Sequence, residues 1–108
     1  MDDKLLELRK ISYTAGMVYD GALKLCSDAL TGDDKDKIKA AAAKQIIAGK
    51  DYGVSMAKLL AYVESLEQTE TIQQETKYLH KLLDLLDREL EAAERLASLS
   101  EQLAALNS

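Results

Sequence analysis

The sequence predicts an all-α protein, folded as an elongated antiparallel three-helix bundle. The 108 residues include no Pro, Trp or Phe, whereas strands and tight turns usually draw on aromatic and Pro residues. Apolar residues recur at the three-four spacing of one face of a helix, as in coiled coils. Helix stop and start signals occur near residues 32 and 70. A chain of this length forms one core, so we expect a single domain of residues 1–108.

The first helix is expected over residues 3–30. Its middle, ISYTAGMVYDGALKLC, has a helical period but small residues on the apolar side. Two neighbouring ridges give it a wide face that is able to meet two other helices. One consists of Leu8, Ile11, Ala15, Val18, Ala22, Leu25 and Ala29, and the other of Leu5, Ser12, Gly16, Tyr19, Leu23, Cys26 and Leu30.

The second helix is expected over residues 33–68. In LTGDDKD, Gly32 is suited to end the first helix in a left-handed conformation, and Asp33 is suited to cap the second. Gly49 and Gly53 are the weak point, since each costs about 1 kcal/mol relative to Ala inside a helix. A break there gives a four-helix variant. We expect continuity, because one apolar stripe crosses the two glycines without interruption.

The third helix is expected over residues 71–106. Thr71 precedes Gln74 by three residues, the arrangement of a capping box at a helix start. The apolar row begins with Ile72, Leu79, Leu83, Leu86, Leu90 and Ala93. It then moves around the helix to Ala92, Leu96, Leu99, Leu103 and Leu106. This drift indicates that the C-terminal half meets a different surface, either the open end of the same bundle or a partner.

The small residues of the first two helices are predicted to face each other. If the first turn is centred near Gly32, residues opposite one another have numbers that sum to about 64, which brings Gly16 toward Gly49 and suggests a close approach of two helices. The same register places four polar side chains in one buried layer: Ser12, Tyr19, Gln45 and Tyr52. They either satisfy each other's hydrogen bonds or line a site for a small molecule between the helices.

Charge and composition restrict the function classes. The net charge of −5 argues against nucleic-acid binding, which needs an excess of Lys and Arg. No apolar run is long enough for a membrane span, and the N-terminus lacks the pattern of a secretory signal, so we expect a cytoplasmic protein without membrane contact. One His and one Cys cannot supply three or four metal ligands. We therefore expect no metal, no cofactor and no enzymatic activity, with Cys26 as a buried apolar residue.

His80 raises the alternative of a phosphocarrier. The run AGMVYDGALKLCSDAL resembles, in texture, the first helix of sugar phosphotransferase subunits of the lactose and cellobiose type, which are three-helix proteins of this length. Their His-rich active stretch has no counterpart in QQETKYLHKLL, and the H-x-x-K-G pattern of phosphotransfer domains is also missing. A His phosphocarrier is therefore a minor alternative to an exposed His80 paired with Asp84.

The favoured function is a non-enzymatic helical module for protein–protein interaction or oligomerisation, acting as scaffold, adaptor or chaperone. Its length and topology resemble spectrin-type repeats and small secretion chaperones, although the spectrin-type Trp is missing. Two apolar rows are candidate interfaces with a partner protein or a second copy. The first consists of Ile47, Val54 and Ala61, and the second of Leu96, Leu99, Leu103 and Leu106.

Two alternatives to this function come from other features of the sequence. One is the small-molecule site in the polar layer. The other is an artificial, designed bundle, suggested by the lack of Pro, Phe and Trp. Glycines in the middle of a helix and a Gln on its buried side argue against an idealised design.

Overall fold

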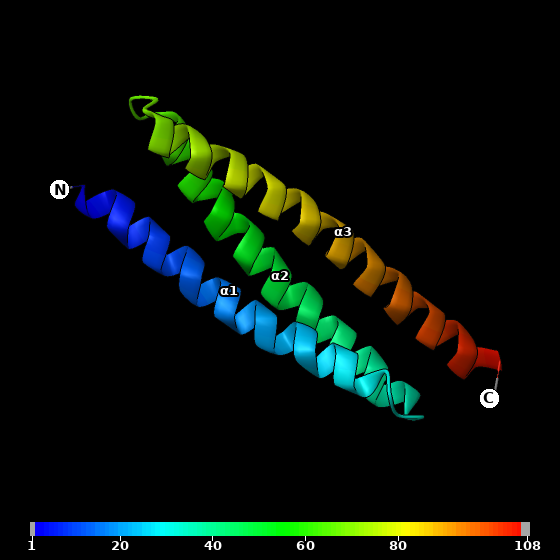
Figure 1. Ribbon diagram of the computed structural model, residues 1–108. Coiled ribbons are helices and arrows are strands. Elements are labelled where there is room, and N and C mark those ends of the chain that lie inside the picture. The colour runs from blue at the N-terminus through cyan, green and yellow to red at the C-terminus, as the bar shows by residue number, and fades with distance from the viewer. Residues whose placement is uncertain (1, 107–108) are drawn as a thin grey trace.

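Three long helices build the whole structure, a computed structural model that describes residues 2–106. They are α1 (Asp3–Ala29), α2 (Lys35–Glu64) and α3 (Glu70–Leu106), and together they measure 58 × 19 × 18 Å. Helix α2 packs against both neighbours, and successive helices run in opposite directions, so that the two ends of the chain lie at opposite ends of the molecule (Figure 1). The predicted elongated, antiparallel three-helix bundle is confirmed. The predicted domain includes residues 1, 107 and 108, which lie outside the described residues.

The first turn differs from the prediction in both of its key residues. Gly32 does not take the left-handed conformation, because no described glycine has a positive φ. Helix α1 instead ends in two short-range hydrogen bonds, from Thr31 N to Asp28 O and from Gly32 N to Ala29 O, both 3.2 Å long. Asp34, and not Asp33, caps α2, accepting hydrogen bonds from the backbone of Asp36 and Lys37. These bonds satisfy backbone groups at the two helix ends that have no partner within the helix.

The second turn is longer than predicted, because α2 ends at Glu64 and not at residue 68. The side-chain amide of Gln68 folds back and donates to the carbonyl oxygens of Val63 and Leu66, at 3.2 and 2.8 Å. The amide thereby satisfies carbonyl oxygens that would accept backbone N–H groups if the helix continued for another turn. Thr69, and not Thr71, caps α3, since its hydroxyl accepts a hydrogen bond from the backbone N–H of Ile72.

Helix α2 is continuous through Gly49 and Gly53, as predicted. Both glycines lie inside the thirty-residue helix, so the four-helix variant is not what the chain forms. Their helical cost is offset by packing, because α3 side chains occupy the space above them: Leu90 lies over Gly49 and Leu86 over Gly53.

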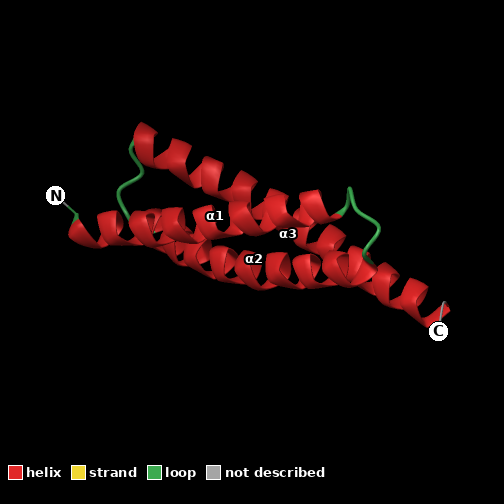
Figure 2. Ribbon diagram, turned by 90° about the horizontal axis from the view of Figure 1, so that it is seen from below, coloured by secondary structure: helices red, strands yellow, loops and turns green. Residues whose placement is uncertain are grey.

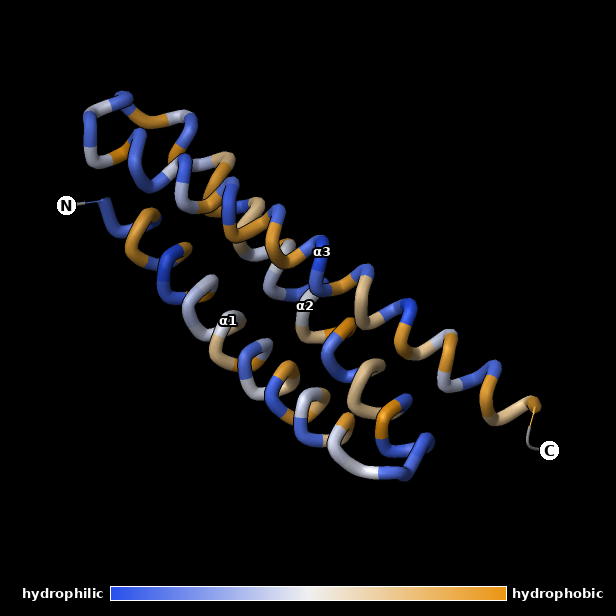
Figure 3. Tube along the Cα trace, turned by 45° about the vertical axis from the view of Figure 1, so that its right-hand side comes forward, coloured by the Kyte–Doolittle hydropathy of each residue, from blue (hydrophilic) through white to orange (hydrophobic). Residues whose placement is uncertain are grey.

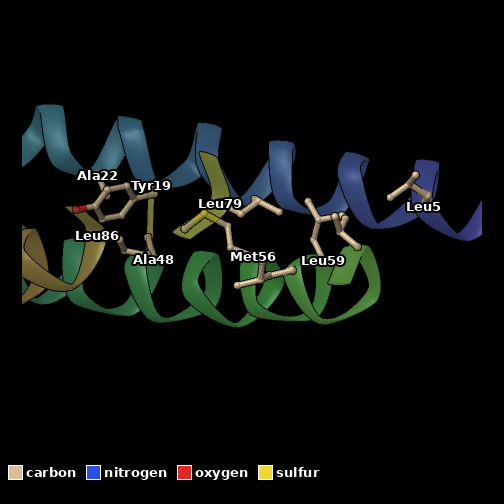
Figure 4. Packing of buried hydrophobic residues seen from close by; sticks show 10 residues of the cluster. Leu5, Tyr19, Ala22, Ala48, Met56, Leu59, Leu79 and Leu86 are labelled. Atoms are coloured by element: carbon tan, nitrogen blue, oxygen red, sulfur yellow. The ribbon is translucent and has the colours of Figure 1, made fainter. Parts of the chain in front are cut away.

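The core follows the seam where α2 meets its two neighbours. Met56 and Val63 of α2 are its most completely enclosed large side chains. Figure 4 shows the ring of Tyr19 reaching from α1 toward Ala48 of α2 and Leu86 of α3. The burial of such side chains holds the three helices together. The cluster of buried residues comprises Leu5, Tyr19, Ala22, Ala48, Met56, Leu59, Leu60, Val63, Leu79 and Leu86.

Helix α1 buries most of one predicted ridge, whereas Ala22 is the only buried residue of the other. The ridge with Ser12, Tyr19 and Cys26 faces the core. On the other ridge, Ile11, Val18 and Leu25 are exposed, because α2 and α3 both lie toward the first ridge and no third neighbour covers the second. Hydrophobic segments recur along the length of α1 (Figure 3).

The C-terminal end of α3 extends past the turn between α1 and α2 (Figure 2). Its buried line continues at seven-residue intervals through Leu79, Leu86, Ala93 and Ser100. The leucines of the drifting row leave this line, and Leu99 and Leu103 are exposed. The nearby ion pair between Lys39 and Glu101, 2.8 Å long, connects α3 to the first turn of α2.

Candidate association surface between α1 and α2

The predicted polar layer forms a packed contact between α1 and α2. Gln45 Nε2 donates a 3.2 Å hydrogen bond to the hydroxyl oxygen of Tyr19, and both side chains are buried. The rings of Tyr19 and Tyr52 pack with centroids 5.8 Å apart. Ser12 is buried on the same side of α1. The register rule is confirmed by the Tyr19–Gln45 bond and by that of Asp2 and Tyr62, since both pairs of residue numbers sum to 64.

The glycines of this layer face large side chains, which corrects the expectation that small residues meet small ones. A Cβ on Gly16 would lie 3.1 Å from the ring of Tyr52. A Cβ on Gly49 would lie 3.0 Å from the Tyr19 ring and would collide with Leu90. The glycines therefore accommodate aromatic rings and a leucine. Gly16 meets Tyr52 and Gly49 meets Tyr19, each of which lies about one turn from the glycine that the register rule pairs with it.

Packing leaves the layer with its polar groups satisfied. Within residues 2–106, no buried side-chain nitrogen or oxygen lacks a hydrogen-bond partner. Burial raises the pKa of Tyr19 above its ordinary value, and the carboxylate of Glu89 adds to this effect. Tyr19 thus keeps its hydroxyl proton at neutral pH and serves as a neutral acceptor for Gln45. Within the layer, Tyr19 and Gln45 satisfy each other by a hydrogen bond, and the ring of Tyr52 packs against that of Tyr19.

An open groove runs along the other side of the α1–α2 contact. Three hollows follow one another, and neighbouring hollows share lining residues: Leu8 and Lys58 belong to the first and second, and Asp51 to the second and third. The second and third have volumes of about 430 and 470 Å³. We call the whole feature the α1–α2 groove. Its other lining residues are Lys4, Ile11, Ala15, Val18, Gly21, Ala22, Leu25, Lys44, Ile47, Ala48, Val54, Ser55, Ala61, Tyr62 and Ser65.

The groove has apolar walls and a floor of small residues. Ile47 and Val54, which the sequence predicts as an interface, are 66% and 55% exposed on the α2 wall, and Ala61 is exposed at its end. Ala22, Ala48 and Ser55 are buried beneath them. Small floor residues leave room for side chains entering from outside, as the holes of a coiled coil receive knobs.

The α1 wall is the part of this surface that the sequence prediction missed. Ile11, Val18 and Leu25 recur every seven residues, the same interval as the predicted row on α2, and Val18 is 61% exposed. This shared interval is the signal that could have revealed them. The sequence alone places these residues in the core, because the pattern of one helix does not tell which of its two ridges faces the neighbouring helices.

The second predicted row, at the C-terminal end of α3, is divided by the structure. Leu96 is half-buried and lines a hollow of about 330 Å³ between α1 and α3, whose floor includes Gln45. Leu99, Leu103 and Leu106 are exposed along the projecting end of α3. None of the hollows described above is lined by these three leucines. In these hollows, no second helix faces them.

The remaining chemistry-bearing residues are spread apart. Cys26 is buried, which raises the pKa of its thiol. His80 is exposed, and its Nε2 lies 3.8 Å from a carboxylate oxygen of Glu64 on α2, not beside the predicted partner Asp84. Among residues 2–106, no three His, Cys, Asp or Glu side chains gather as a metal site would need.

Comparisons of the chain with protein-family models, with curated proteins and with solved structures find no match. No helix in the described part of the chain is both long and apolar enough to cross a membrane. The α1–α2 groove is therefore the feature from which a function has to be argued.

Proposed function

We propose that this chain is a non-enzymatic helical module for protein–protein association, and that it binds a helix of its partner in the α1–α2 groove. The observation that carries the proposal is the pair of exposed apolar rows on facing helices, Ile11, Val18 and Leu25 on α1 and Ile47 and Val54 on α2. Connected exposed apolar residues typically mark an interaction site, whereas isolated ones do not.

The shape of the groove favours a helix as the bound element. Both walls carry an apolar residue about every two turns, and a helix with its own apolar row presents side chains at the same interval. A fourth helix lying there completes a four-helix bundle, in which α1 then buries both of its ridges.

The size of the exposed surface agrees with a missing partner. The chain exposes 7408 Å², whereas a compact protein of its mass exposes roughly 5,900 Å². The difference is about 1,500 Å², which exceeds the roughly 800 Å² that each partner buries in a standard protein–protein interface. The elongated shape accounts for part of this excess, and that shape itself presents a long side to a partner.

The buried, free thiol of Cys26 fits a reducing compartment, so a cytoplasmic location is part of the proposal. The row of Leu99, Leu103 and Leu106 is the second candidate surface. It lies on a single helix without a facing wall, and it therefore buries less of a bound helix than the groove does.

A designed helical peptide with leucines at three-four spacing and uncharged glutamine flanks tests the proposal. We expect it to bind the wild-type chain in a fluorescence anisotropy titration. The variant Ile47→Ser/Val54→Ser removes two apolar contacts and should weaken binding tenfold or more. Both residues are more than half exposed, so the variant is expected to fold normally.

The matched control is Leu99→Ser/Leu103→Ser, which removes two exposed leucines from α3. It should bind the peptide as tightly as the wild type. Loss of binding in this control alone moves the association surface to the end of α3, and no binding by the wild type contradicts helix binding altogether.

A further inference from the structure

We propose that the partner helix is acidic, an amphipathic helix with glutamates or aspartates on both sides of its apolar row. This inference rests on the proposed function, because it specifies the charge of the helix that the α1–α2 groove binds. It follows from the charges that line the groove, which differ in sign from those of the chain as a whole.

Lysines dominate the charged residues of the groove. Lys4, Lys44 and Lys58 line its hollows, and Lys10 lines an adjoining one beside Ile11. Asp51 is the only acidic residue among the lining side chains. The complete chain has 19 acidic and 14 basic residues, with a net charge of −5. An acidic protein with a basic, apolar groove selects an acidic apolar partner and repels a basic one.

Two of these lysines are also unpaired and well placed. Lys44 and Lys58 are exposed, and neither has a carboxylate within ion-pair distance among residues 2–106. They lie fourteen residues apart on α2, which corresponds to roughly 21 Å along the helix. Ile47 and Val54 lie between them. A bound helix of about four turns therefore places its apolar row over these two residues and its acidic residues near both lysines.

The same charges argue against a second copy as the occupant. Asp51 is midway between Lys44 and Lys58. An antiparallel two-fold pairing of α2 with its copy that is centred on the groove, at Asp51, therefore brings Asp51 against Asp51 and each Lys44 near a Lys58. A parallel pairing brings each of the three against itself. A two-fold interface repeats the same contacts on both sides, so both of these pairings set like charges together, which is destabilising.

The concave form of the groove favours a helix over an anionic membrane. Lysines beside apolar residues also suit an anionic lipid surface. That surface binds the convex face of an amphipathic helix, whereas the apolar residues here line hollows of about 430 and 470 Å³ between two helices.

Three designed peptides test the inference. They share one leucine row and differ only in the flanking residues, which are glutamates, glutamines or lysines. With the wild-type chain we expect the glutamate peptide to bind about tenfold more tightly than the lysine peptide, the ratio that about three exposed ion pairs provide. Added salt should reduce this ratio, because exposed ion pairs are screened.

Charge reversal in the groove should reverse the preference. We expect Lys44→Glu/Lys58→Glu to bind the lysine peptide more tightly than the glutamate peptide, and Lys44→Gln/Lys58→Gln to show little preference. The matched control is Lys77→Glu/Lys81→Glu, which makes the same change in net charge on exposed positions of α3. It should keep most of the wild-type preference for the glutamate peptide.

The outcomes separate this inference from the proposed function. If the glutamine peptide binds but the other two bind equally well, the groove accepts a helix and the acidic partner is wrong. The same conclusion follows if the control shifts the preference as much as the groove variant. If the chain instead binds phosphatidylserine vesicles, and Lys44→Glu/Lys58→Glu abolishes that binding while no peptide binds, the groove is a membrane surface and the inference is overturned.

Discussion

The amide of Gln45 donates its hydrogen bond to the hydroxyl of Tyr19 inside the contact between α1 and α2, at 3.2 Å. This bond favours one register of the first hairpin, because a shift of one helical turn separates the two groups and leaves the buried Gln45 amide without its acceptor. The hairpin register in turn brings the wall of α1 beside the wall of α2. The buried polar contact on one side of the hairpin therefore aligns the open groove on the other.

Removing either partner of this bond should destabilise the chain. We expect Tyr19→Phe to lower the free energy of unfolding by about 1–2 kcal/mol, because the buried Gln45 amide then lacks its acceptor. Gln45→Met should cost less, because the Tyr19 hydroxyl also interacts with the carboxylate of Glu89. The double variant should lose less than the sum of the single losses, as urea denaturation of all four proteins can determine. Additive losses would show that the two groups act independently.

Gly49 should resist replacement by Ala. A Cβ there collides with Leu90 and approaches the ring of Tyr19, so crowding of about 1–3 kcal/mol outweighs the helical gain of about 1 kcal/mol. Gly21→Ala is the control, since no atom lies within 4 Å of its added Cβ. Thermal unfolding should show that the control is stabilised and that Gly49→Ala is destabilised. A stabilised Gly49→Ala means that Leu90 moves aside at little cost.

The contact between Asp2 and Tyr62 should make stability depend on pH. The Tyr62 hydroxyl donates to both carboxylate oxygens of Asp2, at 2.9 and 2.7 Å. This bond is the main cause that lowers the pKa of Asp2 below its ordinary value near 3.8 and raises the pKa of Tyr62. A lowered carboxyl pKa stabilises the fold above the ordinary pKa, and the stabilisation is lost as the pH falls through the folded-state pKa.

Tyr62→Phe removes this contact. We expect the variant to be less stable than the wild type at neutral pH, and we expect the difference to disappear as the pH falls through the lowered pKa of Asp2. The difference in stability should also shrink as the pH rises above the ordinary pKa of tyrosine. The Tyr62 hydroxyl donates its hydrogen bond only while it is protonated, so the stabilisation is lost as the pH rises through the raised pKa of Tyr62. Tyr13→Phe, at a side chain that is 71% exposed, should match the wild type throughout. A pH-independent difference for Tyr62→Phe would point to lost packing alone.

The ion pair between Arg9 and Glu75 connects α1 to α3. Arg9 Nε lies 2.9 Å from one carboxylate oxygen of Glu75 and Nη2 lies 2.5 Å from the other, and the pair raises the pKa of Arg9. Arg9 is partly exposed to solvent, so we expect Glu75→Gln to cost only about 0.5–1 kcal/mol. Urea denaturation at low and high salt should show this cost shrinking with salt. A larger, salt-independent cost would show that Glu75 acts through packing.

The sequence predicts the helices well and the contacts between them only in part. Helical period and the runs of polar residues near the turns locate all three helices, because these signals are local. Asp33 and Asp34 are equally suited to cap α2, and Thr69 and Thr71 are equally suited to cap α3. Which residue of each pair acts as the cap depends on the path of the backbone, which the residue types alone do not reveal. Helix α2 ends early where the side chain of Gln68 folds back onto the carbonyl oxygens of the helix end. Helix propensities do not predict such a contact.

The candidate surface shows the same division. The exposed row on α2 is predicted because Ile47 and Val54 lie opposite a complete apolar stripe on the same helix. The α1 wall is missed because Val18 belongs to a ridge as apolar as the buried one, and only the positions of α2 and α3 determine which ridge is covered. Gly16 and Gly49 likewise indicate from the sequence that neighbouring groups approach the helices closely at these positions. They do not indicate that the approaching groups are the rings of Tyr19 and Tyr52.

The most direct test of the account is a map of backbone amide chemical shifts on addition of the glutamate-flanked peptide. We predict that the largest changes occur at the groove floor and walls, around Ala22, Ala48 and Val54, with little change at Leu99 and Leu103. Changes confined to the end of α3, or spread evenly over the chain, would contradict the α1–α2 groove as the association surface.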